Sequence, residues 1–325
     1  MTFRRGIERT EKGQVLSLGF FDGVHRGHQK VLTLAFREAD QLGKRLEILT
    51  FYPHPVNFLN FPNSLNYLTT YQEKYQLIQD FFPKSSVRFL RFNQQLRSTT
   101  PESFVQKIGL FFQPEMVVVG KNFRFGVNRR GDSIFLKEKL EAEGIKVKIV
   151  PTWQEDKQTV SSSKIRFLIE KGFISKANQF LGYPFFLMGR VRKGKGMGRK
   201  LGFPTANLYP PVRKILPPPG VYFGYAQAVN LALVWPALIY VGTKPSLEAN
   251  ARQVVEVYCP DLSDKNLYQE KLAVYFLQFS RAEKVFPDLT ALQAQIAQDL
   301  KKFQQYLHYH PGMINYLLNV KKLEV

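Results

Sequence analysis

The order of apolar patterns along the chain restricts its fold more than any other feature. In the first half, short apolar runs typical of buried strands alternate with segments that have the apolar spacing of helices. After residue 183 the pattern changes to short β-rich runs separated by Gly, Pro and polar turns. The expected strands of the first half are residues 15–20, 45–51, 87–92, 116–119 and 145–150. The expected helices are residues 29–39, 71–82 and 174–181, two that begin at Thr100 and Asp132, and one that follows residues 160–163 and ends at Lys171.

This change of pattern predicts two domains. Strands that alternate with helices form parallel sheets with right-handed crossovers, so residues 1–183 are expected to be a Rossmann-like α/β domain. Residues 184–325 are expected to be an all-β antiparallel barrel with a C-terminal helix and tail. The apolar face of that helix is predicted to contain Leu289, Leu292, Ile296, Leu300 and Phe303, and the residues after Lys301 are interpreted as the helix end and a tail docked by Tyr309, Met313 and Leu317.

The turn between the first expected strand and helix contains a pattern typical of phosphate binding. Residues 19–28 read GFFDGVHRGH. Unpaired N–H groups and the positive end of the helix dipole favour an anion there, and glycines let the backbone approach it closely. His25 and His28 are three residues apart, so they share a helix face and can reach the same phosphoryl oxygens. The predicted phosphate-binding residues of the turn are Gly19, Phe20, Phe21, Asp22 and Gly23.

An isolated H-x-G-H pattern has other interpretations. One is a histidine that caps the helix beside a histidine in the core, and another is a pair of metal ligands. Ligands of parallel sheets bind beyond the carboxyl ends of the strands. The turns at residues 53–55 and 120–122 follow two other expected strands, so we expect them to converge on the same cleft.

The chain resembles the bacterial family of bifunctional riboflavin kinase and FMN adenylyltransferase (FAD synthetase), whose N-terminal half belongs to the H-x-G-H nucleotidyltransferases. The resemblance extends over residues 15–300 and also includes residues 51–55 (FYPHP), 118–126 (VVGKNFRFG), 160–166 (VSSSKIR), 198–207 (GRKLGFPTAN) and 219–222 (PGVY).

For the N-terminal half, the resemblance implies that the AMP part of ATP is joined to FMN with release of pyrophosphate, assisted by Mg²⁺. It implies that His25 and His28 stabilise the α-phosphate in the transition state. The residues implied to hold the triphosphate are Ser162, Ser163 and Arg166, and the candidates for the flavin side are Pro53, His54, Pro55 and Asn122. Alternatively, Ser161 to Ser163 is only a helix cap, and the turn around His54 is only a rigid turn. Phe123 and Phe125 are interpreted as core residues.

For the C-terminal half, the resemblance implies a barrel that phosphorylates riboflavin to FMN with ATP. Thr205 and Asn207 are implied to bind Mg²⁺, and Glu256 is implied to take the proton of the ribityl hydroxyl. The implied phosphate-binding residues are Gly194, Gly198 and Arg199. The chain departs from the family at residues 240–242 (YVG), 245–247 (PSL), 256–258 (EVY) and 267–269 (LYQ), so a weakened or lost kinase activity is an alternative.

Composition sets the remaining expectations. The 46 basic and 26 acidic residues give a net charge of +20, and residues 171–245 contain no Asp or Glu. Such a field attracts triphosphate, and it also allows a second hypothesis, a basic nucleic-acid-binding or regulatory protein on the same fold. A third hypothesis is a relative of the enzymes that charge tRNA, although no segment is typical of an anticodon-binding domain. We expect small-molecule substrates and no nucleic acid.

The single cysteine, Cys259, excludes an internal disulfide and a cysteine-rich metal site. The first 14 residues lack the apolar segment of a secretory signal, and the longest apolar run, residues 231–241, is too short for a membrane helix. We therefore expect a cytoplasmic protein that does not enter the membrane. The sequence makes no prediction about oligomeric state.

Overall fold

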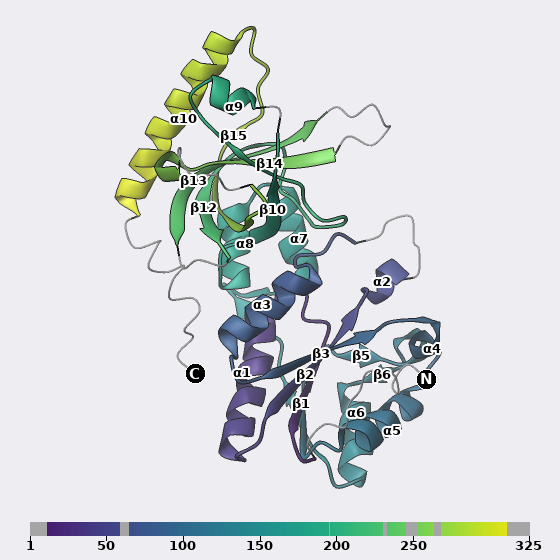
Figure 1. Ribbon diagram of the computed structural model, residues 1–325. Helices are drawn as coiled ribbons and strands as arrows, with labels where there is room; N and C mark the ends of the chain where they lie inside the picture. Colours follow the sequence, from purple (N-terminus) through teal and green to yellow (C-terminus); the bar gives the residue numbers. More distant parts are fainter. Residues whose placement is uncertain are drawn as a thin grey trace. The chain divides into compact units, whose positions relative to one another are not determined.

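The chain folds into two compact units. A computed structural model describes residues 12–58, 65–194, 196–229, 233–244, 252–262 and 268–310 (Figure 1). Of these residues, the first unit contains those up to 66 and from 74 to 162, and the second contains those from 67 to 73 and from 163 onward. The predicted domain boundary after residue 183 stays a prediction.

The first unit is built on a five-stranded parallel sheet, which confirms the predicted Rossmann-like fold. The strand order is β3-β2-β1-β4-β7, so the order reverses at β1, which has β2 on one side and β4 on the other. Ligands of such sheets bind where the order reverses, beyond the carboxyl ends of the strands. The strands are β1 (Val15–Leu18), β2 (Leu46–Tyr52), β3 (Ser86–Arg91), β4 (Met116–Gly120) and β7 (Lys146–Val150).

Helices cover both faces of this sheet. On one face lie α1 (Arg26–Gln41) and the part of α3 (Tyr71–Phe81) that belongs to this unit, and the rings of Phe36 and Phe82 are in contact there. On the other face α5 (Pro101–Phe112) and α6 (Ser133–Ala142) share a core with alternate residues of β1 and β4. Thr100 and Asp132 are the N-caps of α5 and α6, as predicted. Phe125 is buried in this core and Phe123 packs against it, which confirms their interpretation as core residues.

Several short elements were not predicted from the sequence, because they are too short to have a clear periodicity. They are α2 (Pro55–Phe58), α4 (Gln94–Arg97), β5 (Arg124–Phe125), η1 (Val127–Arg129), β6 (Gly131–Asp132), β8 (Gln154–Glu155) and β9 (Gln158–Thr159).

The second unit contains an antiparallel barrel, as predicted. The barrel is closed and has six strands, in the order β10-β11-β14-β13-β12-β15. The strands are β10 (Phe186–Arg192), β11 (Ala206–Leu208), β12 (Gly220–Ala228), β13 (Val234–Lys244), β14 (Arg252–Tyr258) and β15 (Lys271–Ala282). The unit also contains α7 (Ser162–Glu170) from its second residue onward, α8 (Ile174–Leu181), α9 (Met197–Lys200) and η2 (Pro260–Leu262).

A buried ion pair explains why residues 67–73 belong to the second unit. The carboxylate of Glu73 accepts hydrogen bonds from Lys214 Nζ at 2.8 Å and from the backbone N–H of Met188 at 2.8 Å. It also accepts one from the N–H of Thr70, whose hydroxyl accepts from the N–H of Glu73, so the two residues form a capping box at the start of α3. Both side chains of the ion pair are fully buried, and these bonds satisfy the carboxylate.

The C-terminal helix α10 (Leu289–Tyr309) packs along the barrel (Figure 1). Its contact face differs from the predicted one. Phe303 is buried against Phe223 of β12, and Leu300 packs beside it, but Leu289 is 55% exposed. Apolar spacing alone does not show which turns of a helix reach the core. The helix continues to Tyr309, which is exposed, so the prediction that Tyr309 docks the tail is wrong. Met313 and Leu317 lie outside the described residues.

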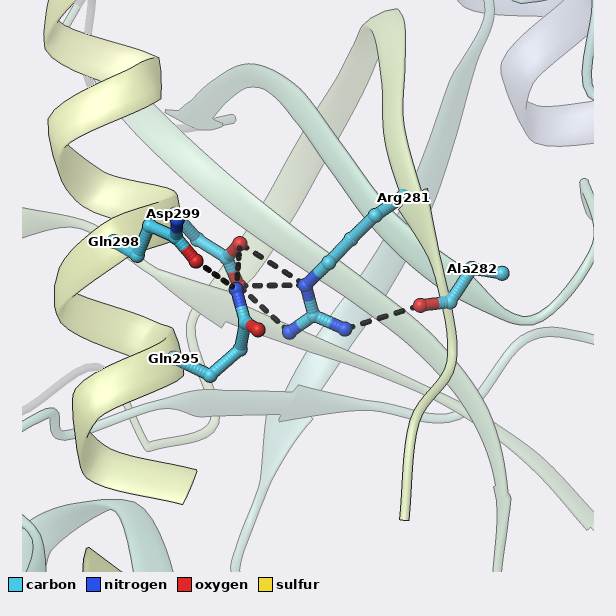
Figure 2. Close-up of polar contacts among 5 residues, drawn as sticks. All are labelled: Arg281, Ala282, Gln295, Gln298 and Asp299. Atoms are coloured by element: carbon cyan, nitrogen blue, oxygen red, sulfur yellow. Dashed lines mark hydrogen bonds and ion pairs between the residues drawn. The ribbon is translucent and has the colours of Figure 1, made fainter. Parts of the chain in front are cut away.

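Arg281 and Asp299 join the barrel to α10 through a buried polar contact (Figure 2). Arg281 Nε and Nη2 donate to the Asp299 carboxylate at 3.0 and 2.6 Å, and Gln295 Nε2 donates to the same carboxylate at 3.0 Å. Arg281 Nη1 donates to the carbonyl of Ala282. Because the fork of the guanidinium matches a carboxylate, this pair fixes the position of the helix along β15.

Replacing Asp299 with alanine should lower the free energy of unfolding by about 3 to 5 kcal/mol, because it leaves the Arg281 charge without its buried partner. Chemical denaturation of this variant would measure the loss. Gln305→Ala is the control, since Gln305 is exposed on the same helix and should change stability by about 0.5 kcal/mol or less. Equal stability of the two variants would contradict this account of the contact.

Candidate active sites

The first candidate site lies at the carboxyl ends of β1 and β4, where the strand order reverses. The turn at residues 19–25 leaves β1 there and leads into α1. Phe21 and Val24 have positive φ angles of 51° and 34°, a conformation that costs energy for residues other than glycine. Such strain persists only where the surroundings fix the backbone.

Hydrogen bonds to two carbonyl groups fix this turn from the interior of the unit. The carbonyl of Phe20 accepts from Lys74 Nζ at 2.7 Å and from the Thr50 hydroxyl at 2.9 Å. The carbonyl of Asp22 accepts from the Ser162 hydroxyl at 2.9 Å. In a trans peptide the next N–H points away from the carbonyl, so the N–H groups of Phe21 and Gly23 point away from these donors.

His25 and His28 lie face to face at the end of this turn. Their rings are stacked with centroids 3.6 Å apart and planes inclined by 17°. His25 is also the N-cap of α1, because its Nδ1 accepts a hydrogen bond from the N–H of His28 at 3.4 Å. The interpretation of His25 as a capping residue is therefore correct. Since Nδ1 accepts, the neutral ring of His25 has its proton on Nε2, which leaves a donor on the opposite edge.

The surroundings keep His28 uncharged. Burial lowers the pKa of His28 well below its ordinary value, and the charges of His25 and Lys74 lower it further. The buried Nδ1 of His28 has no hydrogen-bond partner in the part of the chain that the structure describes. No group of three or more His, Cys, Asp or Glu side chains suited to a metal ion is found in that part either. His28 therefore meets a ligand as a neutral imidazole.

Two glycines make room for these rings. A side chain at Gly19 would place Cβ 2.5 Å from the ring of Phe21, and that ring packs edge-on against His28. A side chain at Gly27 would lie 3.2 Å from the ring of His25. The aromatic packing around the pair thus requires glycine at position 19, and a side chain at position 27 would crowd the ring of His25.

Two further predicted loops lie at the same edge of the sheet. His54, in the turn after β2, contacts the ring of Phe20 at a centroid distance of 4.1 Å, so the structure brings the turns after β1 and β2 together. Asn122 follows β4, is exposed, and donates through Nδ2 to the hydroxyl of Thr152 after β7 at 3.2 Å. Pro53 and Pro55 flank His54 and are partly buried.

The serine motif spans the two units. Ser162 begins α7 and contacts the phosphate-binding turn, whereas Ser163 and Arg166 are counted with the second unit. Ser163 is exposed and Arg166 is buried. Their contribution to the first site stays a prediction.

Sequence reasoning missed Lys74 and Thr50. Lys74 is 3% exposed, and its Nζ lies 4.1 Å from the ring centroid of Phe20 and 3.3 Å from Thr50 Oγ1. Burial lowers its pKa from an ordinary value of 10.5 to about 8, and the charge of Asp22 opposes this effect. A signal was present, because Lys74 precedes Leu77 and Ile78 by three and four residues and therefore lies on the apolar stripe of its helix.

The second candidate site lies on the outer face of the barrel. Asn207 of β11 and Tyr240 of β13 are both register partners of Glu256 in β14, so the three side chains point to one face. The hydroxyl of Thr205 donates to Glu256 Oε2 at 3.3 Å. The structure therefore brings together Thr205, Asn207 and Glu256, which the sequence resemblance had grouped.

The glycine loop lies directly against this cluster. A side chain at Gly194 would place Cβ 2.5 Å from Asn207 Nδ2, and one at Gly198 would lie 2.4 Å from the carbonyl of Phe203 and 3.2 Å from Thr205 Oγ1. Arg199 is exposed on the single helical turn α9 of the same loop. Only glycine permits the loop to lie this close to Thr205 and Asn207.

The departures from the family pattern surround Glu256. The hydroxyl of Tyr240 makes a short hydrogen bond with Glu283, and burial together with this bond raises the pKa of Tyr240. Tyr258 packs edge-on against Phe203, and burial raises its pKa. Residues 245–247 and residue 267, where the chain also departs from the pattern, lie outside the described residues.

Comparisons with known proteins show the family to which the chain belongs. The family model described as FAD synthetase matches residues 7–164, and the one described as riboflavin kinase matches residues 181–307. A protein of Buchnera aphidicola named bifunctional riboflavin kinase/FMN adenylyltransferase is 32% identical over 95% of this chain and 99% of its own length. The chain belongs to this bifunctional family. A member from Listeria monocytogenes is 31% identical, over 90% of this chain and 92% of its own length.

The same two-part architecture occurs in a solved structure. A Streptococcus pneumoniae protein, titled macrolide-efflux protein, superposes with a TM-score of 0.82 at 26% identity, over 92% of this chain and 96% of its own. In the present chain, no helix among the described residues is long and apolar enough to cross a membrane.

Proposed function

We propose that the first unit transfers the adenylyl group of ATP to FMN, giving FAD and pyrophosphate, and that the second phosphorylates riboflavin to FMN. The chain is thus a transferase of FAD biosynthesis that catalyses two successive steps. The observation that carries the first assignment is the stacked pair of His25 and His28 on the glycine-bent turn. The Thr205, Asn207 and Glu256 cluster supports the second.

Adenylyl transfer needs positioning and charge stabilisation rather than a nucleophile from the protein. A phosphate oxygen of FMN forms a bond to the α-phosphorus of ATP, and the bond from that phosphorus to the pyrophosphate oxygen breaks. Imidazole N–H groups of His25 and His28 donate to the oxygens on which negative charge develops. Phe21 and Gly23 supply backbone N–H groups beside them.

Other residues of the motifs complete the first site in this proposal. Ser162, Ser163 and Arg166 hold the triphosphate through hydroxyl groups and a guanidinium. His54 and its flanking prolines, together with Asn122, contact the flavin side. The contact of His54 with Phe20 supports this, because it places a candidate flavin residue against the phosphate turn.

Phosphoryl transfer in the second unit needs a base. Glu256 accepts the proton of the ribityl 5′-hydroxyl, whose oxygen then forms a bond to the γ-phosphorus of ATP while the bond to ADP breaks. Gly194, Gly198 and Arg199 contact the phosphates. The partly buried position of Glu256, beside the hydroxyl of Thr205, supports this role.

Thr205 and Asn207 fit a magnesium ion. Their hydroxyl and amide oxygens are hard ligands, and Mg²⁺ in kinases is bound by one or two protein groups together with substrate phosphates. When bound there, Mg²⁺ neutralises charge on the ATP phosphates. The close approach of Gly194 to Asn207 leaves the glycine loop within reach of the same phosphates.

Replacing Thr205 with valine removes this hydroxyl at nearly constant volume. The Mg²⁺ concentration for half-maximal FMN formation should then rise by about tenfold, as expected for loss of roughly 1 to 2 kcal/mol of binding energy. Titrating Mg²⁺ in a riboflavin phosphorylation assay measures this. FAD formation from FMN by the same variant serves as the control and should keep its Mg²⁺ requirement, whereas an unchanged requirement for FMN formation would exclude Thr205 as a ligand.

Small molecules are sufficient partners for this activity. The basic stretch without acidic residues, residues 171–245, serves in this proposal to attract ATP rather than nucleic acid, and the cytoplasm is the proposed location. Retention of the protein on immobilised RNA or DNA at about 150 mM salt would contradict the absence of a nucleic-acid partner.

A further inference from the structure

Lys74 is a buried cation beneath the phosphate-binding turn that none of the motifs includes. Its Nζ donates to the carbonyl of Phe20 at 2.7 Å, lies 3.3 Å from Thr50 Oγ1, and stands 4.1 Å from the ring centroid of Phe20. Burying an ammonium group in such a place costs free energy that two hydrogen bonds to neutral oxygens do not fully return. A buried charge that lowers stability beside a candidate site indicates a functional reason for its presence.

The fold does not need Lys74 to satisfy the Phe20 carbonyl. That oxygen already accepts from the Thr50 hydroxyl at 2.9 Å. Removing the lysine therefore leaves the carbonyl with a partner, and it removes the cost of the buried charge. A purely structural explanation of Lys74 is consequently weak.

Two charged groups that interact with Lys74 belong to the phosphate-binding turn or its helix, and they are Asp22 and His28. Asp22 attracts it and His28 is repelled by it. Glu73, which precedes Lys74 in α3, forms its ion pair with Lys214 instead.

We infer that Lys74 is a positioning residue for adenylyl transfer, which fixes the Phe20 peptide so that the following N–H faces the phosphates and which places a fixed positive charge behind the His25–His28 pair. This inference rests on the proposed function of the first unit. Lys74 acts through the turn and His28, so it needs no contact with ATP. Its positive charge favours the neutral form of His28, as an N–H donor requires, and attracts the triphosphate.

The inference makes the reaction sensitive to alkaline pH. Because burial lowers the pKa of Lys74 to about 8, free enzyme loses this charge as the pH rises through that value. The kcat/KM for ATP in FAD formation should therefore fall above about pH 8, since this ratio reports groups of the free enzyme. Bound triphosphate stabilises the ammonium group, so kcat should fall only at higher pH.

Lys74→Met tests the inference, with Lys84→Met as the matched control, because Lys84 is exposed in the same unit. Lys74→Met should lower kcat/KM for FAD formation at neutral pH by about a hundredfold, remove the fall above about pH 8, and leave the melting temperature equal or higher. FMN formation from riboflavin by the same protein should be unchanged, which shows that the chain is folded. Lys74→Arg should retain part of the activity and shift the fall to higher pH.

Three results would overturn the inference: Lys74→Met activity within about twofold of that of Lys84→Met, an unchanged pH profile, or a loss of activity matched by a lower melting temperature. The double variant His25→Ala, His28→Ala is measured in parallel. If the double variant is inactive and Lys74→Met is fully active, only the inference about Lys74 fails. If the double variant also forms FAD normally, the proposed site itself is wrong.

Discussion

Replacing His28 with alanine is expected to lower FAD formation from FMN and ATP by about a hundredfold to a thousandfold, the loss observed when one preorganised donor to a developing charge is removed. His28 is held neutral by burial and by its charged neighbours, and its ring is fixed by stacking on His25 and by the edge of Phe21. The variant keeps the backbone N–H of residue 28, which donates to His25 Nδ1, so the turn should keep its shape. The effect should therefore be mainly on kcat.

Removing His25 should reduce the rate as well and should also destabilise the start of α1. Its Nδ1 is the acceptor for the N–H of His28, and loss of an N-cap costs about 1 kcal/mol. His25→Asn restores a capping side chain without the imidazole. His25→Asn should therefore be as stable as the wild-type protein but as inactive in FAD formation as His25→Ala.

The controls for both histidines use the second activity of the chain. His308 is exposed near the end of α10, and His308→Ala should leave both reactions unchanged. FMN formation from riboflavin should continue in each variant of the pair. If His28→Ala forms FAD at the rate of His308→Ala, the assignment of this site is wrong.

Replacing Glu256 with glutamine is expected to lower FMN formation from riboflavin by about a hundredfold to ten-thousandfold, the usual contribution of a general base. Glutamine keeps the shape of the side chain and can still pair with the Thr205 hydroxyl, but it cannot accept the proton of the ribityl group. FAD formation from added FMN should be unchanged. Initial rates with each substrate separately measure both effects.

Glu270→Gln is the matched control for Glu256, because Glu270 is an exposed carboxylate of the same unit. Equal rates of FMN formation in the two variants would contradict the role of Glu256 as the base. The wild-type rate itself tests the alternative of a weakened kinase, since Tyr240 and Tyr258 stand beside Glu256 where the family pattern differs. Absence of FMN formation by the wild-type protein would show that these departures abolish the activity.

The sequence predicted those parts of the fold that depend on periodicity and on local chain chemistry. The central strands β1, β2 and β4 of the parallel sheet are mostly buried apolar runs, and helix α8 was predicted with its observed limits because an apolar face and a final glycine mark it. The turn between β1 and α1 was also predicted, since glycine spacing and paired histidines are local features. The glycine loop at residues 194–199 lies against Thr205 and Asn207, as the order of the motifs implied.

Features that depend on contacts between distant residues could not be predicted in this way. Lys74 lies 54 residues from the carbonyl that it binds, and Asp299 lies on a helix as a polar residue whose partner is on β15. The exposure of Leu289 could not be predicted either, because periodicity shows which face of a helix is apolar but not how far the barrel extends beneath that face. The spacing of the two histidines also does not show that His25 caps α1, because this depends on the orientation of its ring.

The central claim is that each unit carries its own reaction with its own residues. Product chromatography of wild type, His28→Ala and Glu256→Gln, each incubated with Mg²⁺ and ATP plus either riboflavin or FMN, tests it most directly. We predict that His28→Ala converts riboflavin to FMN and stops there, and that Glu256→Gln converts FMN to FAD but leaves riboflavin unchanged. The claim would be contradicted if either folded variant lost both reactions, or if either variant kept both.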